Sequence, residues 1–237
     1  HLSIRRQRQM CIRDRGGAVE CWGAATTDYG QADGRPGPYI QVSAGGYHTC
    51  ALTPDGDVHC WGEDSSGQVG GVAGVSAGPY TQVTTGVYHT CALTPEGEAD
   101  CWGDTGIQNY GQSDDKTGPY TQLTAGGWHT CALEPDGDVD CWGRNGDGQA
   151  NDQTGPYTQV SAGLFHSCGL KADGEVACWG MNVHGQVGSG HTGPYTQVAT
   201  GGYHTCALTG GDAECWGAVT IDHGQAANQT GPFTQLS

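Results

Sequence analysis

The sequence predicts an all-β protein, a β-propeller of about six blades, on three observations. Six tryptophans recur at intervals of 39, 41, 40, 37 and 37 residues, at Trp22, Trp61, Trp102, Trp142, Trp179 and Trp216. Each interval contains several short β-type segments, which is typical of a propeller blade and not of a helical repeat. The chain has 43 glycines among 237 residues and few of the residues that favour helices, which excludes a helical bundle.

Each repeat is expected to contribute the strands of one small sheet. Residues 80–85 are typical of an opening strand, and residues 47–53 and 57–61 of the next two strands, which a tight turn at residues 54–56 joins. Both faces of the resulting hairpin carry apolar side chains, whereas a sheet open to water has one polar face. We therefore expect each sheet to be sandwiched between its neighbours.

Twelve cysteines are predicted to form six disulfides, one across the strands of each blade. The pairs are Cys11 with Cys21, Cys50 with Cys60, Cys91 with Cys101, Cys131 with Cys141, Cys168 with Cys178, and Cys206 with Cys215. The last pair is nine residues apart and the others ten, because the last hairpin turns on Gly210 and Gly211 alone. Opposed residues on antiparallel strands have Cα atoms about 4.5–5.5 Å apart, a separation that suits a disulfide.

This pairing predicts a secreted, cell-surface or periplasmic location, since disulfides persist in oxidising compartments. Two alternatives remain open. Buried free cysteines could fill the core of a cytosolic propeller. A zinc ion could use His48, Cys50 and Cys60, which share one face, although a fourth ligand is missing. We assign no metal and no cofactor to the chain.

The first fifteen residues, 1–15, lie outside the repeat pattern, and we expect them to be a foreign or truncated leader. They hold five of the nine basic residues, Arg5, Arg6, Arg8, Arg13 and Arg15. Residues 16–237 are expected to form a single propeller domain. Cys11 nevertheless stands ten residues before Cys21, which matches the interval of the other pairs, so a sixth disulfide is open.

The repeat resembles that of the regulator of chromosome condensation family. Gly-Gly-Tyr-His-Thr-Cys-Ala-Leu at residues 45–52 is followed by Asp-Gly at 55–56, Trp-Gly at 61–62 and Gly-Gln at 67–68, and the pattern returns four more times. The family, which includes the bacterial β-lactamase inhibitor protein type II, implies a β-propeller of typically seven blades. A fragment of a seven-bladed propeller is therefore an alternative. The cysteines are similar to those of exported bacterial relatives.

Members of this family are mostly protein-binding platforms, and a few are guanine-nucleotide exchange factors. Our leading hypothesis is a non-enzymatic exported scaffold that binds a protein or a surface glycan. The alternative is an exchange-factor-like regulator of a small GTPase. We predict no catalytic residues, because no nucleophile elbow, phosphate loop or Ser/His/Asp grouping interrupts the repeats.

Charge and hydropathy limit the partners. The chain has 25 acidic and 9 basic residues, which give a net charge of −16. Because nucleic-acid affinity depends largely on Lys and Arg, we expect no nucleic-acid partner. No apolar run approaches the roughly 20 residues that span a bilayer. Self-association is open, since terminal blades with unpaired strands could pair between molecules.

Sequence variation concentrates in the loops between Trp-Gly and Gly-Gln, and variable loops on a rigid scaffold are common recognition sites. The candidate ligand surface comprises Tyr29, Ile107, Tyr110, Met181, His184, Ile221 and His223.

We expect structural hydrogen bonds from the repeated histidines, because equivalent positions in neighbouring blades are too far apart for one metal ion. The histidines are His48, His89, His129, His166 and His204. The tryptophans are expected to pack between blades and to donate their indole N–H groups to carbonyls.

Overall fold

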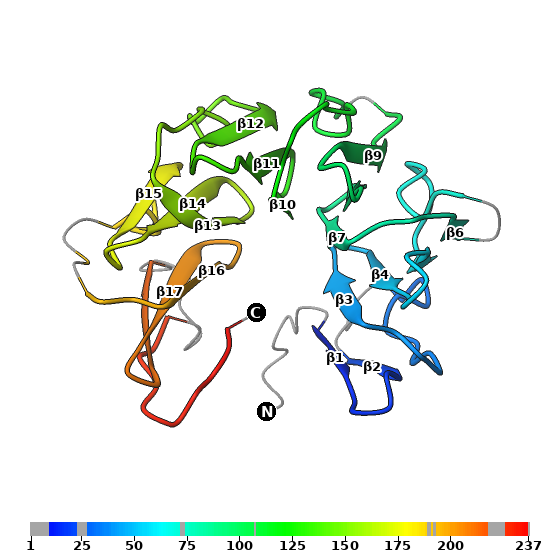
Figure 1. Ribbon diagram of the computed structural model, residues 1–237, viewed down its shortest axis with the longest axis horizontal. Helices are drawn as coiled ribbons and strands as arrows, with labels where there is room; N and C mark the ends of the chain where they lie inside the picture. The colour runs from blue at the N-terminus through cyan, green and yellow to red at the C-terminus, as the bar shows by residue number, and fades with distance from the viewer. Residues whose placement is uncertain are drawn as a thin grey trace, which may run out of the picture. The chain divides into compact units, whose positions relative to one another are not determined.

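The computed structural model describes residues 10–22, 28–71, 74–106, 108–188, 191, 193–217 and 226–236. In these residues every regular element is a β-strand, and the strands form six small antiparallel sheets (Figure 1). The predicted all-β class and its repeated sheets are therefore confirmed. The same residues contain no helix long and apolar enough to cross a membrane.

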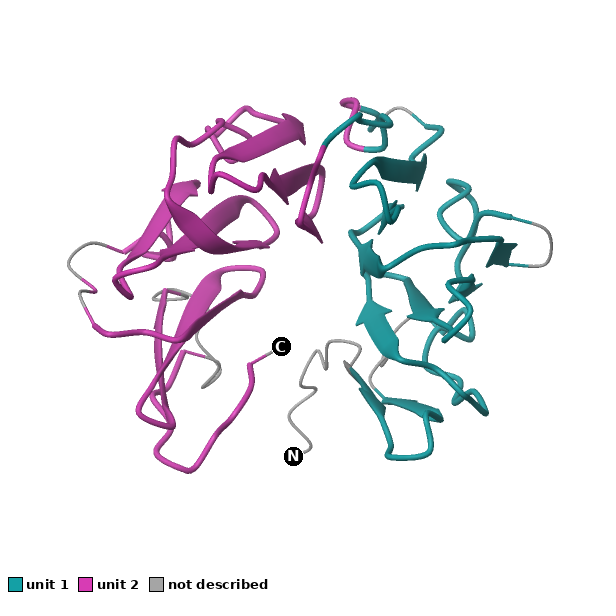
Figure 2. Ribbon diagram, in the orientation of Figure 1, with its two compact units in different colours: residues 1–109, 113–118 teal, residues 110–112, 119–237 magenta. Residues whose placement is uncertain are grey.

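The chain divides into two compact units, shown in teal and magenta in Figure 2. Unit 1, residues 1–109 and 113–118, carries three sheets. The strands of these sheets are β1 (Met10–Arg13) and β2 (Val19–Trp22); β3 (Gln41–Ala44), β4 (His48–Leu52), β5 (Val58–Gly62) and β6 (Val75–Ser76); and β7 (Gln82–Thr85), β8 (His89–Leu93) and β9 (Ala99–Gly103).

Unit 2, residues 110–112 and 119–237, carries three sheets of three strands each. The strands are β10 (Gln122–Ala125), β11 (His129–Leu133) and β12 (Val139–Gly143); β13 (Tyr157–Ala162), β14 (His166–Lys171) and β15 (Val176–Gly180); and β16 (Gln197–Thr200), β17 (His204–Thr209) and β18 (Asp212–Gly217). Within each sheet, consecutive strands pair in sequence order, so every sheet is a simple meander.

All twelve cysteines are disulfide-bonded in the predicted pairs, with Cα atoms 4.0–4.1 Å apart. The last hairpin turns on Gly210 and Gly211, whose φ angles are 57° and 94°. A two-residue turn with both φ angles positive suits the twist of a hairpin. The shorter repeat therefore keeps Cys206 directly opposite Cys215.

The first hairpin follows the same pattern. β1 lies within residues 1–15, the segment that we expected to precede the repeats, and it pairs with β2 so that Cys11 faces Cys21. The Cys11 Sγ lies 3.7 Å from the Thr49 hydroxyl of β4 in the neighbouring sheet. The disulfide of Cys50 makes the equivalent contact, with its Sγ 3.6 Å from the Thr90 hydroxyl.

The hydrophobic core lies between adjacent sheets of each unit. Every residue of β4, β8 and β11 is buried, which confirms that these central strands are covered on both faces. In unit 1, Leu52 and Val58 of one sheet pack with Val83 and Ala92 of the next. Because each sheet offers two apolar faces, it needs a neighbour on each side to exclude water from them.

In four of the sheets, a glutamine of the first strand bonds to the opening segment of the next repeat. The Gln41 side chain donates to the Val83 carbonyl at 3.1 Å and accepts from the Val83 amide at 2.9 Å. Equivalent double bonds join Gln122 to Val160, Gln159 to Val198, and Gln197 to Leu236. The segment ending at Leu236 thus takes, beside Gln197, the position of an opening strand.

A glycine three residues before each histidine leaves room for the imidazole, and its replacement should destabilise the fold. A Cβ at Gly126 would lie 2.6 Å from the Gly163 carbonyl oxygen and even closer to the His129 ring. We expect Gly126→Ala to lower the free energy of unfolding by about 1–3 kcal/mol, the usual cost of overpacking. Urea denaturation followed by tryptophan fluorescence would measure this change.

Gly106→Ala is the matched control, since a Cβ at Gly106 would meet no atom within 4 Å. This variant should unfold at nearly the wild-type urea concentration. Equal midpoints for Gly126→Ala and Gly106→Ala would contradict the close approach of backbone and imidazole.

Candidate functional site

The structure describes four of the seven predicted ligand-contact residues. Tyr29 and Tyr110 have exposed fractions of 52% and 51%. Met181 and His184 are half-buried. Ile107, Ile221 and His223 lie outside the described residues. The candidate ligand surface as a whole remains a prediction.

Each variable loop starts beside the aromatic residue that precedes a repeated histidine. The first loop residue after Trp-Gly donates its amide to the carbonyl of that aromatic residue at 2.8–3.0 Å. These bonds run from Glu63 to Tyr47, from Asp104 to Tyr88, from Arg144 to Trp128, and from Met181 to Phe165. The loops and these aromatic side chains therefore share one end of each sheet, opposite the tight hairpin turns.

Within each unit, the aromatic side chains at this end contact one another from sheet to sheet. We call them the aromatic row: Tyr47 and Tyr88 in unit 1, and Trp128, Phe165 and Tyr203 in unit 2. Tyr47 stacks on Tyr88 at a centroid distance of 5.5 Å, and Trp128 stacks on Phe165 at 5.0 Å. Phe165 and Tyr203 are 6.1 Å apart. All five are half-buried, so each keeps part of its surface open to solvent.

Two predicted contact residues extend the aromatic row. The Tyr29 ring meets Tyr47 edge-on at 6.3 Å, and the His184 ring meets Tyr203 edge-on at 4.9 Å. The residues of the row itself lie outside the variable loops, so the sequence analysis did not predict them as ligand contacts. A signal was present, because the residue before the histidine is aromatic in all five complete repeats.

Charged groups differ along the aromatic row. In unit 2, the Arg144 guanidinium lies 5.0 Å from the centroid of Phe165 and 3.3 Å from the Asp147 carboxylate. In unit 1, Glu63 takes the place of Arg144. Burial, with the nearby Tyr47 and Glu63, raises the pKa of Tyr88, so its phenol stays neutral.

A buried glutamine anchors the end of each loop. The Gln68 Oε1 accepts the Ser66 amide at 2.9 Å, which closes the loop on itself, and the Gln68 Nε2 donates to Glu63. The glutamines at the four equivalent positions, which make the same Oε1 bond, are Gln31, Gln112, Gln149 and Gln186. All five are fully or almost fully buried.

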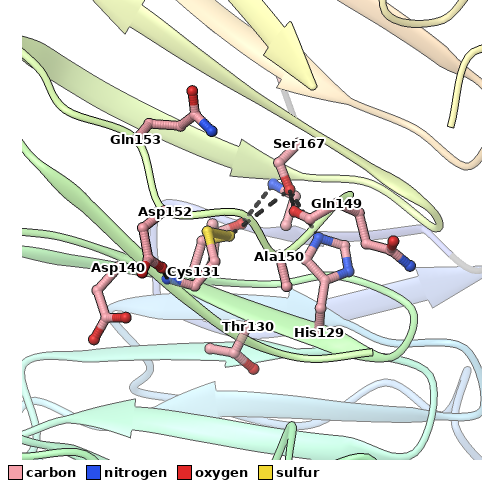
Figure 3. The surroundings of a disulfide bond; sticks show 12 residues. His129, Thr130, Cys131, Asp140, Gln149, Ala150, Asp152, Gln153 and Ser167 are labelled. Carbon is pink, nitrogen blue, oxygen red and sulfur yellow. Dashed lines mark hydrogen bonds between the residues drawn. A yellow bond between two sulfur atoms is a disulfide. The ribbon is translucent and has the colours of Figure 1, made fainter. Parts of the chain in front are cut away.

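The carbonyl of the same glutamine receives donors from the next sheet. Gln149 accepts the Ser167 hydroxyl at 3.0 Å and the Trp179 indole N–H at 3.1 Å. Figure 3 shows Ser167 beside Gln149 and His129, next to the disulfide of Cys131. Trp102 and Trp216 likewise donate to Gln68 and Gln186, so the predicted indole-to-carbonyl bonds are present in these three repeats.

The repeated histidine completes this intersheet network. The His129 Nε2 lies 2.8 Å from the Ser167 hydroxyl, and the same contact joins His48 to Thr90 and His166 to Thr205. Because each hydroxyl donates its proton to the glutamine carbonyl, it accepts from the imidazole. The Nε2 atom of the histidine therefore carries a proton.

Burial keeps His48 and His89 uncharged. Complete burial lowers the pKa of His48 and of His89 to about 3. A neutral imidazole that donates to a hydroxyl fits the predicted structural role. Within the described residues, no group of three or more His, Cys, Asp or Glu side chains could hold a metal ion.

Small antiparallel sheets that repeat along the chain, each with two buried faces, define a β-propeller. The chain belongs to the family described as the regulator of chromosome condensation (RCC1) repeat, which matches residues 39–68, 80–112, 120–149 and 157–186. The predicted resemblance to this family is thereby confirmed. No curated protein matches the chain.

Solved structures show the same fold. The ectodomain of the Physcomitrella patens receptor kinase CR4 is 28% identical with a TM-score of 0.72, and the match covers 89% of this chain and 60% of that one. The ectodomain of the Arabidopsis thaliana receptor kinase ACR4 is also 28% identical, with a TM-score of 0.67 and coverages of 94% and 79%. This chain thus spans less than two thirds of the CR4 ectodomain.

The Saccharomyces cerevisiae protein Prp20, solved bound to Kap60, shares the fold at 19% identity. Its TM-score is 0.72, and the match covers 96% of this chain and 72% of that one. The six disulfides and the likeness to receptor ectodomains are both consistent with an extracellular location.

The lowered pKa of His48 predicts a pH-dependent stability. Between about pH 3 and 6.5 the unfolded chain binds a proton at this residue and the folded chain does not, so stability falls as the pH falls. We expect His48 to contribute a loss of about 1.4 kcal/mol per pH unit in this window. His89, whose pKa is also lowered to about 3, adds to the slope, so His48→Gln should reduce the slope by the contribution of His48 alone. Urea denaturation from pH 7 to 4.5 would measure it.

Above pH 7.5 neither state carries this proton, so the wild type and His48→Gln should show equal slopes there. Parallel curves below pH 6.5 as well would contradict the buried neutral imidazole.

Proposed function

We propose that this protein is an extracellular scaffold that binds a protein partner through the aromatic row and the loops beside it. The observation that carries the proposal is the row itself. Five aromatic side chains, one from each of five sheets, are half-buried at the loop ends of their sheets; two of them stack in unit 1, and three contact one another in sequence in unit 2. Tyrosine and tryptophan are enriched in protein interfaces, because they bury a large area and keep a polar group.

The construction of the loop end supports this proposal. The loops begin on backbone bonds to the aromatic row and end on buried glutamines, so their ends are fixed while the residues between them vary. Fixed loop ends lower the entropy that is lost on binding. The histidines are used in intersheet hydrogen bonds, and we assign the scaffold no catalytic role.

The disulfides favour this proposal over an exchange factor for a small GTPase. Such a factor acts on an intracellular partner, in a compartment that keeps thiols reduced. Six disulfides and the likeness to two receptor ectodomains both support an oxidising location. The glycan partner and self-association stay predictions of the sequence alone.

Capture experiments can test the binding surface. The immobilised protein is incubated with an extracellular protein fraction, and the captured partner is quantified for the wild type and for Tyr29→Ala and Tyr203→Ala. Tyr29 is 52% exposed and Tyr203 half-buried, so the fold should tolerate their loss. We expect about tenfold weaker capture, which corresponds to the roughly 1.4 kcal/mol of an interface anchor.

Asp55→Asn and Asp136→Asn are the matched controls, since these residues lie in the hairpin turns at the opposite end of their sheets. The controls should capture as well as the wild type. Absence of any captured protein, or equal losses for both sets of variants, would refute the proposed function.

A further inference from the structure

In unit 2, the aromatic row already contacts a cation, the guanidinium of Arg144. Its guanidinium carbon lies 5.0 Å from the centroid of Phe165, a cation–π distance. Phe165 is at the same time stacked on Trp128 at 5.0 Å. The Asp147 carboxylate holds the guanidinium at 3.3 Å. The arginine side chain therefore contacts one ring of an aromatic pair and one carboxylate.

Unit 1 repeats the aromatic pair, but it has neither the arginine nor the carboxylate at the position of Asp147, where Ser66 stands. Tyr88 stacks on Tyr47 at 5.5 Å, as Phe165 stacks on Trp128. The position of Arg144, directly after Trp-Gly, is taken by Glu63, whose amide is bonded to the Tyr47 carbonyl at 3.0 Å. The loop residues 28–31 and 63–67 contain three acidic residues and neither lysine nor arginine.

The Glu63 carboxylate is held in place beside this aromatic pair. Its Oε1 accepts the Ser65 amide at 2.9 Å, and its Oε2 accepts from the buried Gln68 side chain. A carboxylate oxygen has two lone pairs, so each oxygen can accept one further bond. An incoming cation therefore meets a carboxylate whose position is already fixed.

We propose that Tyr47, Tyr88 and Glu63 bind an arginine side chain of a protein partner, which lies against the Tyr88 ring as Arg144 lies against the Phe165 ring in unit 2. This inference rests on the proposed function and specifies the chemistry of the partner. A guanidinium suits the site because its planar face stacks on an aromatic ring while its edge donates to a carboxylate. The net charge of −16 adds a long-range attraction for a basic partner.

A peptide of alternating arginine and glycine, six residues long, is the probe for this site, and fluorescence anisotropy on the whole chain is the readout. The same peptide with citrulline in place of arginine has nearly the same shape and no charge. We expect the citrulline peptide to bind at least fivefold more weakly. We also expect Tyr88→Leu to weaken the arginine peptide about fivefold, and Tyr88→Phe to stay within twofold of the wild type.

Two further variants separate this site from general attraction to an acidic protein. Asp55→Asn removes one negative charge at the hairpin turn, the opposite end of the same sheet, so it should leave peptide binding within twofold of the wild type. Glu63→Arg supplies an internal guanidinium at Tyr88 and should reduce peptide binding at least tenfold, while circular dichroism verifies the fold of each variant.

The inference is overturned if the arginine peptide does not bind, if the citrulline peptide binds equally well, or if Asp55→Asn loses as much affinity as Tyr88→Leu. Failure of the peptide, together with protein capture that still depends on Tyr29 and Tyr203, would remove this inference alone. Loss of capture itself would remove the proposed function.

Discussion

A buried hydrogen bond from a histidine of one sheet to a hydroxyl of the next is the interaction on which the rest of the structure depends. The His129–Ser167 bond is an example, and its hydroxyl passes its own proton to the Gln149 carbonyl. One bond thus connects a central strand, the following sheet and the end of a variable loop. A buried donor without its partner costs about 1–3 kcal/mol, so the three groups must be placed together.

The residues of this network recur from repeat to repeat, whereas the residues of the loop at the end of each sheet vary. The disulfide, the histidine and the anchoring glutamine fix the ends of the loop, whereas the residues between them make few contacts that the fold requires. Recognition can therefore change from repeat to repeat without altering the sheets. The contrast of Arg144 beside Phe165 with Glu63 beside Tyr88 shows such a change at one equivalent position.

Features set by nearby residues of the chain are predicted from the sequence more fully than features set by contacts with the next repeat. Cysteine spacing gives all six disulfides, and Gly210-Gly211 explains the shorter interval of the last pair, because both follow from hairpin register. The bonds from Gln41 to Val83 and the stacking of Tyr47 on Tyr88 join residues about forty positions apart. Their detection requires the relative placement of two sheets, which a repeat alone does not give.

The protonation state of the buried histidines tests the central interaction most directly. Two-dimensional ¹⁵N–¹H correlation spectra of the imidazole groups, recorded on the folded protein between pH 7 and 5, report both the tautomer and the charge of each ring. The intersheet bond predicts that His48 carries its proton on Nε2 and remains neutral throughout this range. A proton on Nδ1, or a titration near pH 6.5, would contradict this account.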